Sequence, residues 1–424
     1  MSTPRTASVA LLAIAVLLRP NAAPAASDPA LARARAVLAR HPVMDGHNDL
    51  AWAIRENPKA PGDVFAYDLR TRTAGDTDLG RLREGQVGGQ LWSVYVPAEM
   101  DSGFLRAQLE QIDIARRMLA RYPERLALCT TADEVERAMR AGRVGSLLAM
   151  EGGHGIENSL GALRALYDLG VRSMTLTHSR TLDWADSATD APRHGGLTRF
   201  GEEVVHEMNR LGMLVDLSHV SEETMDDALR VSEAPVIFSH SSARAICSHP
   251  RNVPDAILAR VKRNGGVVMV TFVNAFVSES YSKASEPLWK EYEQRTRGMS
   301  DPVERERIGI EIRSRLPKIE VTVAQVADHV EHVRQVAGVD HVGLGGDYDG
   351  NDAWPTGLED VSGYPRLFAE LVRRGWSDED LGKLASGNVL RVLRGAEAAA
   401  RRAQAGRPPS NATIEALDGS PKRP

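Results

Sequence analysis

Short apolar runs rich in β-branched residues alternate with amphipathic segments along most of this 424-residue chain, and that alternation limits the folds it can adopt. Such runs are typical of strands that are buried on both faces of a parallel sheet. Eight strands are expected, at Val43–Leu50, Gln90–Val96, Val144–Glu151, Val171–His178, Met213–His219, Pro235–His240, Gly266–Phe272 and Val342–Asp347. Helices are expected at Phe104–Tyr122, Ala132–Ala141, Ser159–Asp168, Phe200–Leu211, Ser221–Val231, Pro254–Arg263, Val323–Val336, Tyr364–Arg374 and Asp378–Arg394. Repeated strand–helix units predict an α/β fold, a TIM (β/α)8 barrel, with a doubly wound open sheet as the alternative.

Two segments depart from the alternation. Ser278–Pro317 is highly charged and lies between the seventh and eighth expected strands, so we expect a charged helical insertion there. Residues 27–396 are expected to form one barrel domain. Residues 397–424 are rich in Ala, Arg, Pro and Ser, and this composition predicts a disordered C-terminal tail.

Residues 1–26 have the organisation of a secretory signal peptide. Arg5 precedes an apolar run from Ala7 to Leu18, and small residues follow at positions 22–27. The apolar run is shorter than a transmembrane helix requires. We therefore expect cleavage near Ala25 or Ala26, export to the periplasm or secretion, and no stable membrane span in the mature protein. An uncleaved membrane anchor is the alternative.

Charge and cysteine content exclude several classes of protein. The chain has 57 acidic and 52 basic residues, a formal net charge of −5, so bulk electrostatics give no attraction for nucleic acid and no nucleic-acid partner is expected. Cys129 and Cys247 are the only cysteines, which excludes a disulfide scaffold and a cysteine-rich zinc finger. One disulfide between them remains open at this stage.

Titratable side chains stand at the carboxyl ends of six of the expected strands. In a barrel, this is the end that holds the active site. The structural requirement there is for apolar residues, so a repeated histidine or carboxylate indicates a function. The residues are His47 and Asp49, Glu151, His178, Asp216 and His219, His240, and Asp347 with Asp349.

The residue types at these strand ends suit a pair of divalent metal ions. His47 and Asp49 are two residues apart on a strand and therefore face the same side. His219 and His240 can supply two imidazoles from neighbouring strands, and Glu151 has two oxygens with which to bridge two ions. Nitrogen and oxygen ligands without thiolates favour zinc, so two Zn²⁺ per chain are expected.

Two such ions would support hydrolysis. A metal pair lowers the pKa of a shared water and polarises a carbonyl group. Two zinc ions, Asp49, Glu151 and a bridging hydroxide leave a charge of about +1, which would stabilise an oxyanion. Asp347 is a further carboxylate placed to take a proton and pass it to a leaving amine. The alternative for Asp347 is a role as a metal ligand or as a partner of an imidazole.

These residues stand in an ordered series of motifs that resembles the membrane dipeptidase (renal dipeptidase) family of zinc dipeptidases. The resemblance covers about residues 40 to 395. Its motifs are His47-Asn48-Asp49, Glu151-Gly152-Gly153-His154, Thr177-His178, Asp216-Leu217-Ser218-His219, Phe238-Ser239-His240-Ser241-Ser242, His249-Pro250-Arg251-Asn252-Val253-Pro254-Asp255 and Gly345-Gly346-Asp347-Tyr348-Asp349-Gly350.

The resemblance implies a TIM barrel that hydrolyses free dipeptides at a binuclear zinc site through a metal-bridging hydroxide. It implies that His178 contacts the substrate and stabilises the tetrahedral intermediate, that Arg251 holds the terminal carboxylate of the dipeptide, and that Asp347 is the acid/base residue. Metal ligands would be His47 and Asp49 on one ion, His219 and His240 on the other, and Glu151 on both. Homodimers are typical of that family.

Three features differ from the family pattern. A C-terminal lipid-anchor signal is not expected, because the tail lacks a hydrophobic stretch. Most of the cysteines of the animal members are missing, so their disulfides cannot be carried over. No substrate-contacting aromatic residue is matched at Val270–Asn274, which leaves dipeptide preference open. Alternative functions are a related metal-dependent hydrolase of another amide, lactone or β-lactam, and a non-catalytic binding barrel, which the complete ligand set disfavours.

Overall fold

The computed structural model describes residues 28–100, 102–299 and 302–420. The segment predicted to be a signal peptide, residues 1–26, lies outside these ranges. Within them, no helix combines the length and apolar character needed to cross a membrane. Cys129 and Cys247 are both buried and free, so they form no disulfide with each other.

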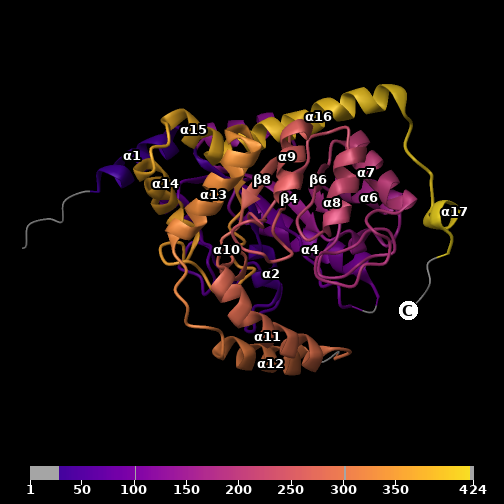
Figure 1. Ribbon diagram of the computed structural model, residues 1–424, viewed down its shortest axis with the longest axis horizontal. Helices are drawn as coiled ribbons and strands as arrows, with labels where there is room; N and C mark the ends of the chain where they lie inside the picture. The colour runs from indigo at the N-terminus through magenta and orange to yellow at the C-terminus, as the bar shows by residue number, and fades with distance from the viewer. Residues whose placement is uncertain (1–27, 101, 300–301, 421–424) are drawn as a thin grey trace, which may run out of the picture.

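Eight parallel strands close into a barrel surrounded by helices (Figure 1). Around the barrel the order is β2-β1-β9-β8-β7-β6-β5-β4, and the pairing of Gly89–Ser93 in β2 with Gly145–Ala149 in β4 closes the ring. The TIM barrel is therefore confirmed, and the open-sheet alternative is wrong. The closing strands are β1 (Val43–Asn48), β2 (Val87–Ser93), β4 (Val144–Glu151), β5 (Val171–Thr175), β6 (Leu214–Asp216), β7 (Ile237–Phe238), β8 (Val267–Val270) and β9 (Val342–Leu344).

One further strand was not predicted. β3 (Leu126–Leu128) pairs with the first residues of β4, Val144–Ser146, whereas β5 pairs with the last four residues of β4. β3 therefore lies beside the barrel without being needed to close it. Three residues are too few to show the alternation that identifies a strand. The second barrel strand also begins at Val87, three residues before the expected start.

Helices follow the strands, and several begin at a residue that caps the first turn. Ser221, Thr131 and Ser377 each accept a hydrogen bond in their side chains from a backbone N–H of the first turn, which satisfies a donor that the helix leaves free. The helices are α1 (Pro29–Arg40), α2 (Leu50–Arg55), α3 (Leu79–Glu84), α4 (Phe104–Arg121), α5 (Ala132–Arg140), α6 (Leu160–Asp168), α7 (Arg199–Leu211), α8 (Glu222–Val231), α9 (Asp255–Asn264), α10 (Asn274–Val277), α11 (Glu279–Thr296), α12 (Pro302–Ser314), α13 (Val323–Ala337), α14 (Tyr364–Arg373), α15 (Asp378–Gly382), α16 (Asn388–Gly406) and α17 (Ile414–Asp418).

The charged insertion is helical, as predicted. α10, α11 and α12 lie between β8 and β9, and α11 and α12 form an arm set apart from the barrel at the bottom of Figure 1. Two-pronged ion pairs hold the arm together: Arg295 binds Glu311 at 2.7 and 2.8 Å, and Arg315 binds Glu291 at 2.8 and 2.8 Å. The charged residues that interrupt the apolar pattern therefore form ion pairs with one another within the arm.

The C-terminal segment differs from the predicted disordered tail. α16 continues to Gly406, ten residues past the expected domain end (Figure 1), and α17 contacts α7. The Asp418 carboxylate accepts hydrogen bonds from the backbone N–H groups of Arg199 and Phe200 at the start of α7. The alanines on which the tail prediction partly rested are good helix formers. Their buried side chains line the inner face of α16. Residues 421–424 lie outside the described ranges.

The barrel has an apolar interior below a polar mouth. Leu147 and Ala149 share a strand face with Glu151, and both are buried in one cluster with Leu214 and Met269. Gly345 allows a close approach at the mouth, because a Cβ atom there would lie 1.8 Å from the carbonyl oxygen of Ser239. The polar strand ends therefore lie directly above a layer of buried apolar side chains.

Candidate active site

The structure brings all seven predicted catalytic and metal-binding residues to the carboxyl end of the barrel. His47 lies in β1, Asp49 caps α2 immediately after it, and Glu151 ends β4. The other four residues come from the loops that follow β5, β6, β7 and β9, and they are His178, His219, His240 and Asp347. The mouth therefore collects side chains from residue 47 to residue 347, as a barrel allows and an isolated helix or hairpin does not.

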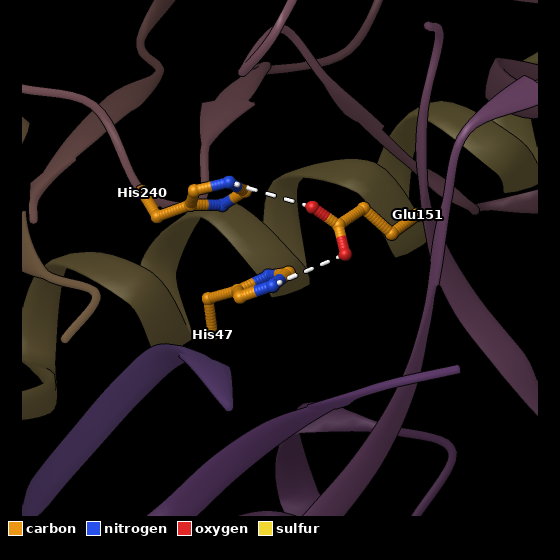
Figure 2. A group of neighbouring side chains, drawn as sticks. All are labelled: His47, Glu151 and His240. Atoms are coloured by element: carbon orange, nitrogen blue, oxygen red, sulfur yellow. Dashed lines mark ion pairs between the residues drawn. The ribbon is translucent and has the colours of Figure 1, made fainter. Parts of the chain in front are cut away.

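Glu151 occupies the centre of this group. Its Oε2 atom lies 3.3 Å from Nε2 of His47, and its Oε1 atom lies 3.1 Å from Nε2 of His219 and 3.6 Å from Nε2 of His240. Figure 2 shows the carboxylate with one oxygen directed at His47 and the other at His240. Ser93 donates a hydrogen bond to Oε2 at 3.1 Å. The two oxygens thus serve two separate sets of imidazoles.

His219 and His240 face each other across a short gap. Their Nε2 atoms are 2.9 Å apart. Two imidazole nitrogens at that distance need a shared hydrogen or a nearby cation, because two bare lone pairs repel. The other side of His240 is fixed by Ser239, whose hydroxyl lies 2.8 Å from His240 Nδ1. A ring with one nitrogen held in this way presents the other to a metal ion.

Two buried aspartates below the mouth hold the strand ends in place, and the sequence did not single out their roles. Asp45 accepts hydrogen bonds from the N–H of His47 at 3.0 Å and from the N–H of Gly346 at 2.6 Å. Asp216 accepts from the N–H of Ser218 at 3.1 Å and from the N–H of Ser239 at 2.9 Å. Each carboxylate therefore joins two neighbouring strand ends. The sequence feature that indicates this role is a single acidic residue inside an apolar strand.

The backbone is strained at two of the site residues. His219 has φ +70° and Asp347 has φ +67°, in the left-handed region that favours glycine. Such a conformation costs about 1 kcal/mol or more and persists only where the surroundings enforce it. The carbonyl of His219 accepts from the N–H of Ala188 at 2.8 Å, and the N–H of Asp347 donates to the carbonyl of His47 at 3.2 Å. Strain of this kind is common at functional sites.

The electrostatic environment near Asp49 stabilises positive charge. Burial alone would lower the pKa of His47, but the carboxylates of Glu151 and Asp49 raise it well above its ordinary value. Burial, with the nearby carboxylates of Asp49 and Glu151, raises the pKa of Asp347 well above that of a free aspartate. A proton is therefore retained at Asp347 more readily than in water, which suits an acid/base group.

The imidazoles on the other side are kept neutral. Burial lowers the pKa of His219 well below its ordinary value, and Arg251 and His178 lower it further. Burial also lowers the pKa of His240, with a further contribution from His47 and Arg251. Neutral imidazole is the form that binds metals.

The donor set fits divalent metal ions. Three groups have ligand atoms within 4.8 Å of one another: His47–Glu151–His240, Glu151–His178–His219 and His47–Asp49–Asp347. Each combines imidazole nitrogen with carboxylate oxygen, and Asp49 Oδ1 is buried without a hydrogen-bond partner among the described residues. These are the donors and the unfilled acceptor expected for zinc. The groups include His178 and Asp347 beside the five predicted ligands, so a ligand role for Asp347 remains an alternative.

Arg251 lies beside the histidines with spare hydrogen-bonding capacity. The side chain is 2% exposed, and it donates to the carbonyl of His240 at 3.2 Å and to the hydroxyl of Ser241 at 3.3 Å. Among the described residues its Nε has no hydrogen-bond partner. Asp347, Glu151 and Asp216 act on the guanidinium only through charge, without a hydrogen bond. Phe276 packs 5.2 Å from its guanidinium group. A buried guanidinium without a hydrogen-bonded acid is suited to bind an acidic group of a ligand.

Two aspartates that accept hydrogen bonds from each other's backbone border the site. Asp349 accepts a hydrogen bond from the N–H of Asp76 at 2.8 Å, and Asp76 accepts one from the N–H of Asp349 at 2.9 Å. Burial and the partner's charge raise the pKa of Asp76 to about 7, and burial raises the pKa of Asp349 to about 6. The pair ties the loop after β9 to the segment between α2 and α3.

This pair predicts a pH-dependent stability. An unfolded aspartate has a pKa of about 3.9, so the folded protein retains a proton that the unfolded chain has lost. Stability should therefore fall as the pH rises from about 4 to about 7, by up to about 1.4 kcal/mol per pH unit for one proton. Asp76→Asn should flatten this slope in urea unfolding, whereas the exposed Asp113→Asn should not. An unchanged slope in Asp76→Asn would contradict the assignment.

Comparison with known proteins agrees with this geometry. A family model described as membrane dipeptidase, peptidase family M19, matches residues 31–407. Dipeptidase 3 of Mus musculus is 42% identical over 378 residues, which cover 88% of this chain and 68% of that protein. Dipeptidase 3 of Rattus norvegicus has the same identity and coverage.

Solved structures show the same relationship. A metallo peptidase from Rhodobacter sphaeroides, liganded with a phosphinate mimic of the dipeptide L-Ala-D-Ala, has a TM-score of 0.69 at 28% identity, covering 84% of this chain and 99% of that one. The probable dipeptidase PvdM from Pseudomonas aeruginosa has a TM-score of 0.75 at 22% identity, covering 88% of this chain and 100% of that one, and supports the fold alone. The match over residues 31–407 and the 42% identity to Dipeptidase 3 confirm the resemblance: the chain belongs to the membrane dipeptidase family, peptidase family M19.

Proposed function

We propose that this M19 peptidase is a binuclear zinc dipeptidase that hydrolyses the peptide bond of free dipeptides. The observation that carries the proposal is that the two carboxylate oxygens of Glu151 face different imidazoles. Its Oε2 faces His47, and its Oε1 faces His219 and His240. A carboxylate shared in this way is suited to bridge two ions. His47 and Asp49 would hold one zinc, and His219 and His240 the other. Bound there, the ions would supply Lewis acidity and an activated water.

The residues around this centre suggest how a dipeptide would be oriented. Arg251 offers a buried cation without an acidic partner, beside the carbonyl of His240, and we assign it to the terminal carboxylate of the substrate. A carboxylate clamp at a fixed distance from the ligands favours dipeptides over longer peptides. The Rhodobacter sphaeroides relative with its dipeptide mimic supports this substrate class.

Two residues are assigned to proton and charge handling. Asp347 lies with Oδ1 4.0 Å from His47 Nε2, and its raised pKa suits a group that takes a proton and returns it to the leaving nitrogen. His178 lies with Nε2 3.6 Å from Glu151 Oε1, within reach of the same volume, and is assigned to substrate contact and stabilisation of the tetrahedral intermediate. Both assignments place the proton steps beside the bridging carboxylate.

Removal of the bridge tests the metal centre. Purified protein should contain about two zinc ions per chain by mass spectrometry and should release amino acids from dipeptides in a chelator-sensitive way. Glu151→Gln should retain less than about one zinc and lose more than about 100-fold in kcat/KM, because the amide lacks the negative charge. Glu110→Gln, on the exposed face of α4, is the matched control. Two zinc ions in Glu151→Gln would contradict the bridging role, and two zinc ions without dipeptide cleavage in the unaltered protein would favour another amide, a lactone or a β-lactam.

Substrate amidation tests the carboxylate clamp. A dipeptide with an amidated C-terminus should be cleaved about 30-fold less efficiently than the free dipeptide, the value of one charge-assisted contact of about 2 kcal/mol. Arg251→Ala should abolish this discrimination, mainly through KM for the free dipeptide. Thermal unfolding of the variant controls for folding. Retention of the full discrimination in folded Arg251→Ala would assign the carboxylate to another group.

We also propose that the protein is exported. The proposal rests on Arg5, the apolar run Ala7–Leu18 and the small residues that follow. The full-length chain, produced in a host with a general secretion pathway, should be recovered outside the cytoplasm with an N-terminus near Ser27 by N-terminal sequencing. Cytoplasmic protein that begins at residue 1 or 2 would contradict export. The homodimer implied by the resemblance stays a prediction.

A further inference from the structure

A chain of hydrogen bonds runs from His178 to a glutamate on another loop. Nδ1 of His178 lies 3.1 Å from the hydroxyl of Ser179, and that hydroxyl lies 2.7 Å from Oε1 of Glu99. Glu99 belongs to the loop between β2 and α4, whereas His178 and Ser179 follow β5. Arg180 approaches the same glutamate oxygen with its Nε at 3.7 Å. These contacts join two loops at the mouth of the barrel.

Counting hydrogens sets the direction of both bonds. An ionised carboxylate can only accept, and a serine hydroxyl has a single hydrogen to donate. Ser179 therefore donates to Glu99, and its oxygen is left to accept from Nδ1 of His178. A neutral imidazole carries one N–H, so its Nε2 then has none.

The surroundings of Nε2 agree with that assignment. Its distance of 3.6 Å from Glu151 Oε1 is longer than an N–H···O hydrogen bond, as expected for two atoms that both present lone pairs. The main chain of His178 is held independently, because the Ser187 hydroxyl donates to its carbonyl at 2.6 Å. The Tyr95 ring packs against the imidazole with centroids 4.8 Å apart. The ring therefore has little freedom to turn and exchange its two nitrogens.

We propose that Glu99 is a positioning residue that acts through Ser179 to hold His178 as the Nδ1–H tautomer and to direct an unprotonated Nε2 at the centre around Glu151. Nδ1–H stays committed to Ser179, so Nε2 is available to bound groups as a hydrogen-bond acceptor. In this tautomer His178 can stabilise the tetrahedral intermediate by accepting from an N–H group of the substrate, not by donating to its oxyanion. The tautomer follows from the contacts of this chain alone. Its consequence for hydrolysis rests on the proposed function.

Nitrogen-15 NMR of histidine-labelled, metal-loaded protein measures the tautomer directly, and His178→Gln identifies the His178 signals. In the unaltered protein, Nδ1 should be the protonated nitrogen. Ser179→Ala removes the link, and Glu99→Gln supplies an amide that can donate to Ser179 and so free its hydroxyl for Nδ1. Both should lose the single Nδ1–H form. An unprotonated Nδ1 in the unaltered protein, or an unchanged tautomer in both variants, would overturn the proposal.

Kinetics with a free dipeptide separate positioning from folding. Glu99→Gln should lower kcat about tenfold or more with KM changed less than about threefold, since the wrong tautomer removes one hydrogen bond between His178 and the reacting substrate. Ser179→Thr keeps the hydroxyl and should rescue the activity lost in Ser179→Ala. Glu110, 51% exposed on α4, gives the matched control Glu110→Gln. An unchanged kcat in Glu99→Gln would overturn the positioning role. A lack of dipeptide cleavage by the unaltered protein, with the Nδ1–H tautomer present, would instead count against the proposed function.

Discussion

The shared carboxylate of Glu151 is the interaction on which the rest of the site depends. A buried carboxylate loses hydration that costs on the order of several kcal/mol unless charges or hydrogen bonds replace it. Here Ser93 and His219 contact it directly, and His47 and His240 lie on its two sides. The apolar floor beneath it makes each of these contacts stronger than it would be in water. The arrangement is stable only if positive charge collects at the mouth.

The surrounding structure serves to hold that arrangement. Asp45 joins β1 to the turn that carries Asp347, and Asp216 joins the ends of β6 and β7. Strained backbone at His219 and Asp347 is tolerated because hydrogen bonds to a neighbouring loop and to β1 fix it. Backbone N–H groups bonded to Asp45 and Asp216 therefore hold the strand ends that carry the proposed ligands. We infer that the barrel strands contribute rigidity together with His47 and Glu151, and that the loops contribute the other site residues.

Sequence reasoning succeeded where the pattern is local. Strand–helix alternation predicted the barrel, and the position of His47 or Glu151 at a strand end predicted the face on which it lies. Prediction from sequence failed where an element is too short to show a pattern or where a contact joins residues far apart in the chain. β3 has three residues, the Ala-rich end of α16 lacks an alternating pattern, and Glu99 meets Ser179 only after the chain has closed the barrel. Asp45 and Asp216 were visible as acids in apolar strands, but their partners were not.

Anomalous diffraction from zinc-loaded crystals, recorded on both sides of the zinc absorption edge, is the most direct test of a binuclear centre built on Glu151. We expect two zinc peaks on opposite sides of the carboxylate, one beside His47 and Asp49 and the other beside His219 and His240. A single peak, or two peaks of which neither contacts Glu151, would contradict it.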